Sequence, residues 1–176
     1  MNRKVIKAYF DYEAEEKWLN HMVSKGWALK KYSFLLYTFE PCEPNEFVYR
    51  IELLTNSVSH PESIKYIEFS KELNVEYITS YFSWVYFRKR TSDGPFEIHS
   101  DARSKMRHIK KIMTFQGMLG ISNLLLGISN LGMGLTNHFS HYVGGINVLI
   151  AIILGYLCYK NYHRINKLKE EILLHE

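Results

Sequence analysis

The chain has 176 residues, enough for one ordinary domain with an appendage and too few for a multidomain enzyme. Apolar residues make up 47% and charged residues 23%, as in an average soluble protein, but the charges are unevenly distributed. Residues 112–159 contain no Asp, Glu, Lys or Arg, whereas the first 99 residues carry 13 basic and 14 acidic side chains. The mean hydropathy of −0.20 therefore averages a polar head and an apolar tail, which excludes a purely soluble protein.

The net charge of +4 does not indicate a nucleic-acid-binding surface. Residues 1–99 sum to −1, residues 100–111 to +4 and residues 160–176 to +1, so the positive excess lies beside the apolar segment. Such a collar suits anionic lipid headgroups, whereas a DNA-binding domain needs a basic face on its folded part. We therefore expect the lipid bilayer as a partner and no direct contact with nucleic acid. The predicted collar consists of Arg103, Lys105, Arg107, Lys110 and Lys111.

Residues 1–99 predict a cytoplasmic α+β domain that opens with a strand and a helix. Residues 5–10 have the composition of a strand, and Asp11 suits the N-cap of a helix that ends before Gly26. Residues 27–40 are dense in Tyr, Phe and Leu and predict two strands. Residues 46–54 alternate between apolar and polar side chains, which predicts a further strand.

The same pattern then returns. The sequence Ser59-His60-Pro61-Glu62 has the form of a capping box, a helical pattern follows it as far as Asn74, and residues 75–90 predict two more strands. A shift of 48 residues superposes Trp18 on Tyr66 and Gly26 on Asn74. We predict two tandem β-α-β-β units that form an antiparallel sheet with two helices on one face. The other face then needs a ligand, a partner or the membrane surface to cover it.

The candidate ligand site combines charged and aromatic side chains of two predicted strands. Arg50 and Glu52 share one face of the strand at 46–54, and Trp84 and Tyr86 share a face of the last strand. A carboxylate among aromatic rings would suit a lipophilic cation. In the alternative interpretation, Arg50 and Glu52 form a solvated pair and the rings belong to the core. The candidate ligand-binding residues are Tyr49, Arg50, Glu52, Trp84 and Tyr86.

The uncharged segment predicts a transmembrane hairpin. Its two apolar stretches, 112–135 and 143–159, flank a polar and aromatic outside loop at 136–142, and each is close to the length that spans the hydrocarbon core. Lys and Arg lie on both outer flanks, in a juxtamembrane linker at 100–111 and a tail at 160–176, so the positive-inside rule places both termini in the cytoplasm. We expect a two-span protein of the cell inner membrane. The first residues show no signal peptide.

Small and amide residues recur at helical spacing along both spans. Steps of three and four residues place them on one side of each helix, as in the seam of two packed helices. This pattern predicts a tight hairpin or a homo-oligomer. A pore lined by asparagines is a further interpretation, although transport paths usually contain ionisable residues. The predicted helix-packing seam consists of Gln116, Gly120, Asn123, Gly127, Asn130 and Gly134 in the first span and Gly144, Asn147, Ala151 and Gly155 in the second.

The sequence predicts no catalytic chemistry. Cys42 lies in a predicted turn and Cys158 at the inner end of the second span, so they cannot form a disulfide. His138 and His141 have a spacing that could bind a metal ion if oligomers brought several loops together, whereas two histidines alone are typical of polar residues at the membrane interface. The sequence contains no Walker loop, HExxH or CxxC motif. We therefore expect a protein without enzymatic activity, metal or cofactor.

Several short strings in the head carry a family resemblance. They are Glu16 to Asn20, Lys25 to Trp27, Tyr49 to Leu53, Ser59 to Ser63, Trp84 to Lys89 and Gly94 to Ile98. Over about residues 1–110 the chain resembles the DUF2812 family. The resemblance implies a bacterial inner-membrane protein with this head before its spans and, because members are often encoded beside a PadR-like repressor, a regulatory role. The tandem unit also resembles GyrI-like (SHS2) effector-binding domains, in architecture only.

These observations favour a membrane-anchored cytoplasmic sensor or regulatory adaptor. Its head would bind a small amphipathic ligand or a protein partner, such as a transcriptional regulator, and the hairpin would hold it at the membrane. The alternative is an accessory subunit of a membrane transporter or envelope complex, in which the seam docks a larger membrane protein. A small oligomeric pore is the third hypothesis.

Overall fold

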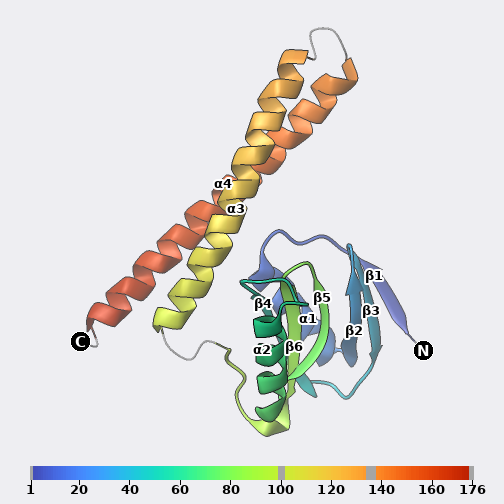
Figure 1. Ribbon diagram of the computed structural model, residues 1–176. Coiled ribbons are helices and arrows are strands. Elements are labelled where there is room, and N and C mark those ends of the chain that lie inside the picture. The colour runs from blue at the N-terminus through green and yellow to red at the C-terminus, as the bar shows by residue number, and fades with distance from the viewer. Residues whose placement is uncertain (1, 99–101, 134–137, 175–176) are drawn as a thin grey trace. The chain divides into compact units, whose positions relative to one another are not determined.

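The computed structural model describes residues 2–98, 102–133 and 138–174 (Figure 1). The chain divides into two compact units, Met1–Ile98 and His99–Glu176, and we describe each by itself. The first unit is an α+β head and the second consists of two long helices, which confirms the predicted fold class.

The head contains the same order of elements twice: strand, helix, strand, strand. The first β-α-β-β unit consists of β1 (Arg3–Ile6), α1 (Tyr12–Ser24), β2 (Trp27–Ser33) and β3 (Leu36–Pro41). The second consists of β4 (Phe47–Leu53), α2 (Pro61–Glu72), β5 (Glu76–Tyr81) and β6 (Trp84–Arg90), followed by the short 3-10 helix η1 (Thr91–Asp93). β1 lies earlier than the predicted strand at 5–10; the other strands lie where the sequence predicted them.

The backbone repeats the duplication in detail. Gly26 and Asn74, which follow the two helices, both have a left-handed φ, of 79° and 58°. The strand after each helix carries a bulge, between Leu29 and Lys31 in β2 and between Tyr77 and Thr79 in β5. The strand orders β1-β3-β2 and β4-β6-β5 also correspond. The two units therefore have one topology, as the internal repeat predicted.

The predicted single sheet is wrong in detail, because the strands form two antiparallel sheets: sheet A (β1-β3-β2) and sheet B (β4-β6-β5). The sheets approach each other at the edge strands β2 and β5, where the Thr79 hydroxyl donates to the Tyr32 carbonyl oxygen over 3.4 Å. Both of these strands carry a bulge, and bulges bend a strand and interrupt its ladder of hydrogen bonds. We attribute the separation into two sheets to this pair of bulges.

The prediction that both helices cover one face is also wrong, because α1 and α2 pack on opposite faces of sheet B. Tyr86 of β6 lies in a core cluster with α1, whereas its neighbours Val85 and Phe87 lie in a second cluster with α2. Successive side chains of a strand point to opposite faces, so β6 is covered on both sides. The first cluster consists of Leu19, Met22, Val23, Leu29, Tyr37, Phe39, Tyr49, Ile51 and Tyr86.

The second unit of the chain consists of α3 (Ala102–Met133) and α4 (His138–Leu174) (Figure 1). Both helices are long and apolar enough to cross a membrane. The described part of the linker predicted at 100–111 is the beginning of α3, because it contains no Gly or Pro to stop a helix. The helix α4 begins at His138, inside the loop predicted at 136–142, and residues 134–137 lie outside the described residues.

Candidate functional site

The helix α1 positions a buried carboxylate at the centre of the head. The Asp11 side chain accepts a hydrogen bond from the Glu13 amide over 3.1 Å and thereby caps the helix. One turn later, Glu15 lies four residues before Leu19 and so shares the apolar stripe that faces the core. Glu15 is only 8% exposed, although a glutamate in the first turn of a helix normally faces solvent.

Two tyrosines hold this carboxylate. The hydroxyl groups of Tyr37, from β3, and Tyr86, from β6, both donate to Glu15 Oε1 over 2.7 Å. Burial raises the pKa of Glu15 above its ordinary value, and the two hydrogen bonds oppose that shift. The ring of Tyr32 lies next to the rings of Tyr37 and Tyr86, at centroid distances of 4.5 and 5.3 Å. The arrangement joins both β-α-β-β units around one polar centre.

A second group of α1 side chains covers the free edge of β4. The Asn20 side chain pairs with the Tyr49 backbone: its oxygen accepts from the Tyr49 amide over 2.7 Å and its amide donates to the Tyr49 carbonyl over 3.2 Å. Glu16 accepts from the Ile51 amide and from the Arg50 guanidinium, both over 3.1 Å. These bonds satisfy backbone groups that an edge strand would otherwise leave unpaired. The helix thus replaces a neighbouring strand.

The structure does not bring the five predicted ligand-binding residues into one site. Register pairs Glu52 with Val85 and Leu53 with Trp84, so Glu52 and Trp84 lie on opposite faces of sheet B. Glu52 accepts a hydrogen bond from Tyr66 of α2 over 2.6 Å. Arg50 shares its face with Glu52, and its guanidinium also lies 5.9 Å from the ring centroid of Phe96.

Tyr49 and Tyr86, the other two members, are core residues. Tyr49 is fully buried and its hydroxyl donates to the Leu29 carbonyl over 3.1 Å. The carboxylate among aromatic rings that the sequence suggested does exist, but it belongs to Glu15. Sequence reasoning missed it because an acidic residue in a first helical turn is explained by the helix dipole. Its spacing to Leu19 and Met22 was the available signal.

The head also contains a cleft of about 480 Å³ beside α2, in the second β-α-β-β unit. The apolar part of its lining includes Val75, which is buried, and Ile67, Tyr77 and Phe47, which are half-buried. Four basic side chains border the cleft. Arg88 pairs with Glu76 over 2.7 Å and Arg90 with Glu46 over 3.4 Å, whereas Lys71 and Lys89 form no salt bridge within the part of the chain that the structure describes.

The helices α3 and α4 touch most closely at two glycines of the predicted seam. A Cβ atom added at Gly127 would lie 3.2 Å from the Gly144 carbonyl oxygen, and one at Gly144 would lie 3.0 Å from the Gly127 carbonyl oxygen. A Cβ at Gly120 would lie 3.5 Å from the Leu154 side chain. Only glycine permits such a close approach of two backbones. These members of the seam therefore join the two helices of one chain.

A hydrogen bond between two amide side chains also joins the helices. The Asn161 amide donates to Gln116 Oε1 over 3.0 Å, and both side chains are buried. Asn123, by contrast, donates to the Leu119 carbonyl of its own helix.

Other predicted seam positions are less enclosed or are not described. Gly155 is exposed, with no atom within 4 Å of an added Cβ, and Leu154 is buried in its place. Asn130, Asn147 and Ala151 are half-buried, and Gly134 lies outside the described residues.

The five collar residues lie in the first turns of α3, where Arg103, Lys105, Arg107 and Lys110 are exposed and Lys111 is half-buried. Cys42 is half-buried, and burial raises the pKa of its thiol, which does not suit a nucleophile. Among the described residues, no three His, Cys, Asp or Glu side chains gather as a metal site would require.

Comparison with known proteins gives a family and no established activity. Residues 11–121 match the family described as "Protein of unknown function (DUF2812)", a match that extends from the N-cap of α1 into α3. No curated protein and no solved structure matches the chain. The resemblance to GyrI-like effector-binding domains therefore stays a prediction. The matched segment covers more than half of the chain, and the chain belongs to the DUF2812 family.

Proposed function

We propose that this protein is a membrane-anchored sensor or regulatory adaptor whose head binds a small amphipathic anion, without catalysing a reaction. The cleft beside α2 is the observation that carries this proposal. Its apolar lining suits a hydrocarbon group, and the two lysines without salt bridges, Lys71 and Lys89, suit a negatively charged group. Its volume of about 480 Å³ falls in the range of small-molecule sites.

The charge of the cleft changes the expected class of ligand. The sequence suggested a lipophilic cation, held by Glu52 among aromatic rings. In the structure Tyr66 donates to Glu52, and Glu15 is enclosed in the core by Tyr37 and Tyr86. Neither carboxylate borders the cleft, and its lining holds two acidic side chains, Glu76 and Asp93, against four basic ones. An anion is therefore the ligand that the available side chains favour.

The apolar helices give the proposed sensor its location. We propose that α3 and α4 cross the cell inner membrane and that the collar binds anionic headgroups on the cytoplasmic side, where the head lies. An amphipathic anion partitions between water and lipid, so a head tethered at the bilayer surface meets it at a raised concentration. The glycines Gly127 and Gly144 contact each other within one chain, so the accessory-subunit alternative would have to use other positions of the seam.

Thermal unfolding of the full chain in nanodiscs tests the proposal. All three tryptophans, Trp18, Trp27 and Trp84, lie in the head, so intrinsic fluorescence follows the head alone. Hexyl phosphate at about ten times its Kd should raise the Tm by roughly 5 °C, because ligand binding to the folded state stabilises it. Hexanol and hexyltrimethylammonium, which have the same chain without the negative charge, should give a much smaller rise.

The matched variants decide whether the cleft is responsible. Lys71→Ser with Lys89→Ser should abolish the response to hexyl phosphate and keep the starting Tm. Lys65→Ser removes an exposed lysine of α2 that does not line the cleft, and it should keep the full response. Equal responses to all three compounds, or equal losses in both lysine variants, would show that the anion does not bind this cleft.

A further inference from the structure

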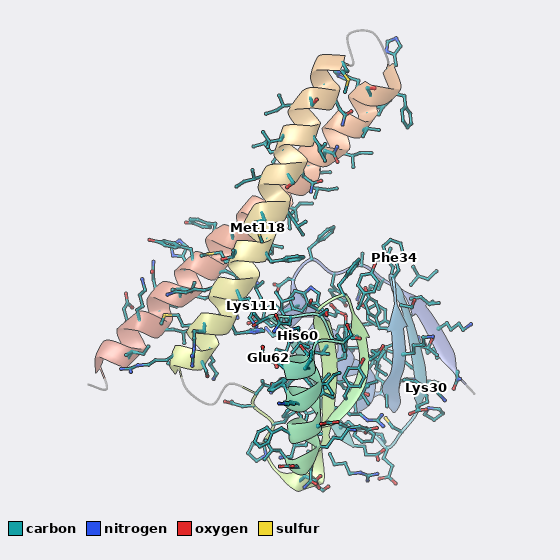
Figure 2. All side chains as sticks on the ribbon, viewed as in Figure 1. Lys30, Phe34, His60, Glu62, Lys111 and Met118 are labelled. Atoms are coloured by element: carbon teal, nitrogen blue, oxygen red, sulfur yellow. The ribbon has the colours of Figure 1, made fainter. Side chains whose placement is uncertain are left out.

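The two hairpins of the head each end in an exposed phenylalanine. Phe34 lies in the two-residue turn between β2 and β3, and Phe82 lies in the equivalent turn between β5 and β6. Their exposed fractions are 68% and 80%. Figure 2 shows Phe34 at the end of its hairpin, away from the body of sheet A. A large apolar side chain is thus presented to solvent at the same place in both β-α-β-β units.

These positions are unfavourable for phenylalanine in the folded backbone. Phe34 and Phe82 have positive φ values of 21° and 53°, and Leu35, the second residue of the first turn, has a φ of 65°. Two-residue hairpin turns of this kind favour Asn and Gly, because a Cβ atom is strained at positive φ. Neither phenylalanine is buried, so little core packing offsets the strain. Folding stability therefore does not explain an aromatic residue at either tip, whereas contact with another surface does.

The two tips form one patch with further aromatic rings behind it. The Tyr81 ring lies 4.7 Å from the Phe82 ring and 6.3 Å from the Phe34 ring, measured between centroids. Trp84, which pairs with Tyr81 in the hairpin ladder, stacks on Tyr12 at 5.9 Å. Phenylalanines at the apex with Tyr and Trp behind them form the gradient of side chains that suits the boundary between hydrocarbon and headgroups.

We propose that the hairpin tips dock the head on the lipid bilayer, with Phe34 and Phe82 inserted at the headgroup boundary. The bilayer is the surface that the tips are expected to contact, because the head is joined to α3 by a short segment of the chain. The head ends at Ile98, α3 begins at Ala102, and the uncharged segment begins at Ile112, which is about 15 Å farther along the helix axis. A membrane span of α3 therefore keeps the head beside a bilayer at all times. A second copy or another protein would have to compete with that surface.

Fluorescence quenching by brominated lipid tests this docking in the full chain. The protein is reconstituted in vesicles of phosphatidylcholine and phosphatidylglycerol, with or without bromine on the shallow carbons of the acyl chains. Bromine quenches tryptophan on contact, and Trp84 is the tryptophan beside a tip. We expect brominated vesicles to reduce the fluorescence of the wild type. The variant Trp84→Phe, which keeps Trp18 and Trp27, should lose most of that reduction.

Tip variants separate docking from folding. Phe34→Asn with Phe82→Asn should abolish the quenching and keep or raise the Tm, because Asn accepts positive φ. Phe69→Ala removes another exposed phenylalanine, on α2, and should leave the quenching unchanged. No quenching in a folded wild type, or full quenching in the tip variant, would overturn the proposal. Its outcome does not depend on whether the cleft binds hexyl phosphate.

Discussion

The two β-α-β-β units of the head share their strands, turns and bulges but differ in what their helices bury. Met22 and Val23 of α1 are core residues, and a shift of 48 residues places Ser70 and Lys71 of α2 at the equivalent positions. The only buried side chains of α2 are serines, whereas α1 buries a stripe of apolar residues. One copy of the helix therefore holds the domain together, and the other lies on its outer face.

This difference explains where the cleft lies. In the first unit the position of Val23 completes the core, whereas in the second Lys71 borders an open cleft. The equivalent polar residues of the two helices differ in the same way. Asn20 forms hydrogen bonds with the edge of β4, whereas its counterpart Glu68 is exposed. A duplicated fold can thus retain its structure through one helix and leave the other free to present a binding surface.

The largest expected effect is the loss of stability when the core cluster that contains α1 is disrupted. Leu19→Ala should destabilise the head by about 3 kcal/mol, because the side chain is fully buried and its removal leaves a cavity. The equivalent change in the other unit, Ile67→Ala, should cost about 1 kcal/mol, since that side chain is half-buried. Urea unfolding of the full chain in nanodiscs, followed by tryptophan fluorescence, measures both. Equal losses would mean that the two helices contribute equally to the core.

The sequence predicted the elements of the head but not the side of the sheet on which each helix packs. Periodicity, the helix-ending Gly26 and Asn74, and the internal repeat are local signals, and the structure confirms the elements that they indicated. Whether two helices share a face depends on contacts between segments far apart in the chain. Val85, Tyr86 and Phe87 are buried in succession, and because successive side chains point to opposite faces, both faces of β6 are covered.

The five residues of the predicted ligand site lie apart for a related reason. Its residues were chosen as if Glu52 and Trp84 faced one another, but the β4–β6 register pairs Trp84 with Leu53. A change of register by one residue exchanges the faces of a strand, and no local pattern fixes that register between strands joined by a helix. The cleft likewise depends on how α2 packs on sheet B, which composition alone does not determine.

An intermediate loss of stability is expected where α1 is hydrogen-bonded to the edge of a strand and the equivalent residue of α2 is exposed. Asn20→Ala removes both hydrogen bonds to the Tyr49 backbone, so it should destabilise the head by about 2 kcal/mol. Glu68→Ala, at the equivalent and exposed position of α2, should change the stability by less than about 0.5 kcal/mol. The same urea titration compares the two variants. A comparable loss in Glu68→Ala would show that α2 is anchored as firmly as α1.

The smallest expected effect is on the pH dependence of stability, to which the buried Glu15 of the first unit contributes. Burial raises the pKa of Glu15 in the folded head, so the folded state favours the protonated carboxyl. Its contribution to stability is then complete below the ordinary carboxyl pKa and is lost as the pH rises through the raised value. Glu15→Gln keeps an oxygen that accepts from Tyr37 and Tyr86 and removes the titration. We expect this variant to lose less stability than the wild type between pH 4 and pH 7.

The control for this pH series must separate Glu15 from its neighbours on α1. Burial also raises the pKa of Glu16, and the charge of Arg50 opposes that shift, so Glu16 contributes a slope of the same sign. The control is Glu16→Gln, which removes that second titration and leaves Glu15 in place. If Glu15→Gln keeps the wild-type slope and Glu16→Gln reduces it, Glu16 carries the titration, and the polar centre between Tyr37 and Tyr86 stays charged throughout. The equivalent of Glu15 in the second unit is Ser63, which cannot contribute to the slope.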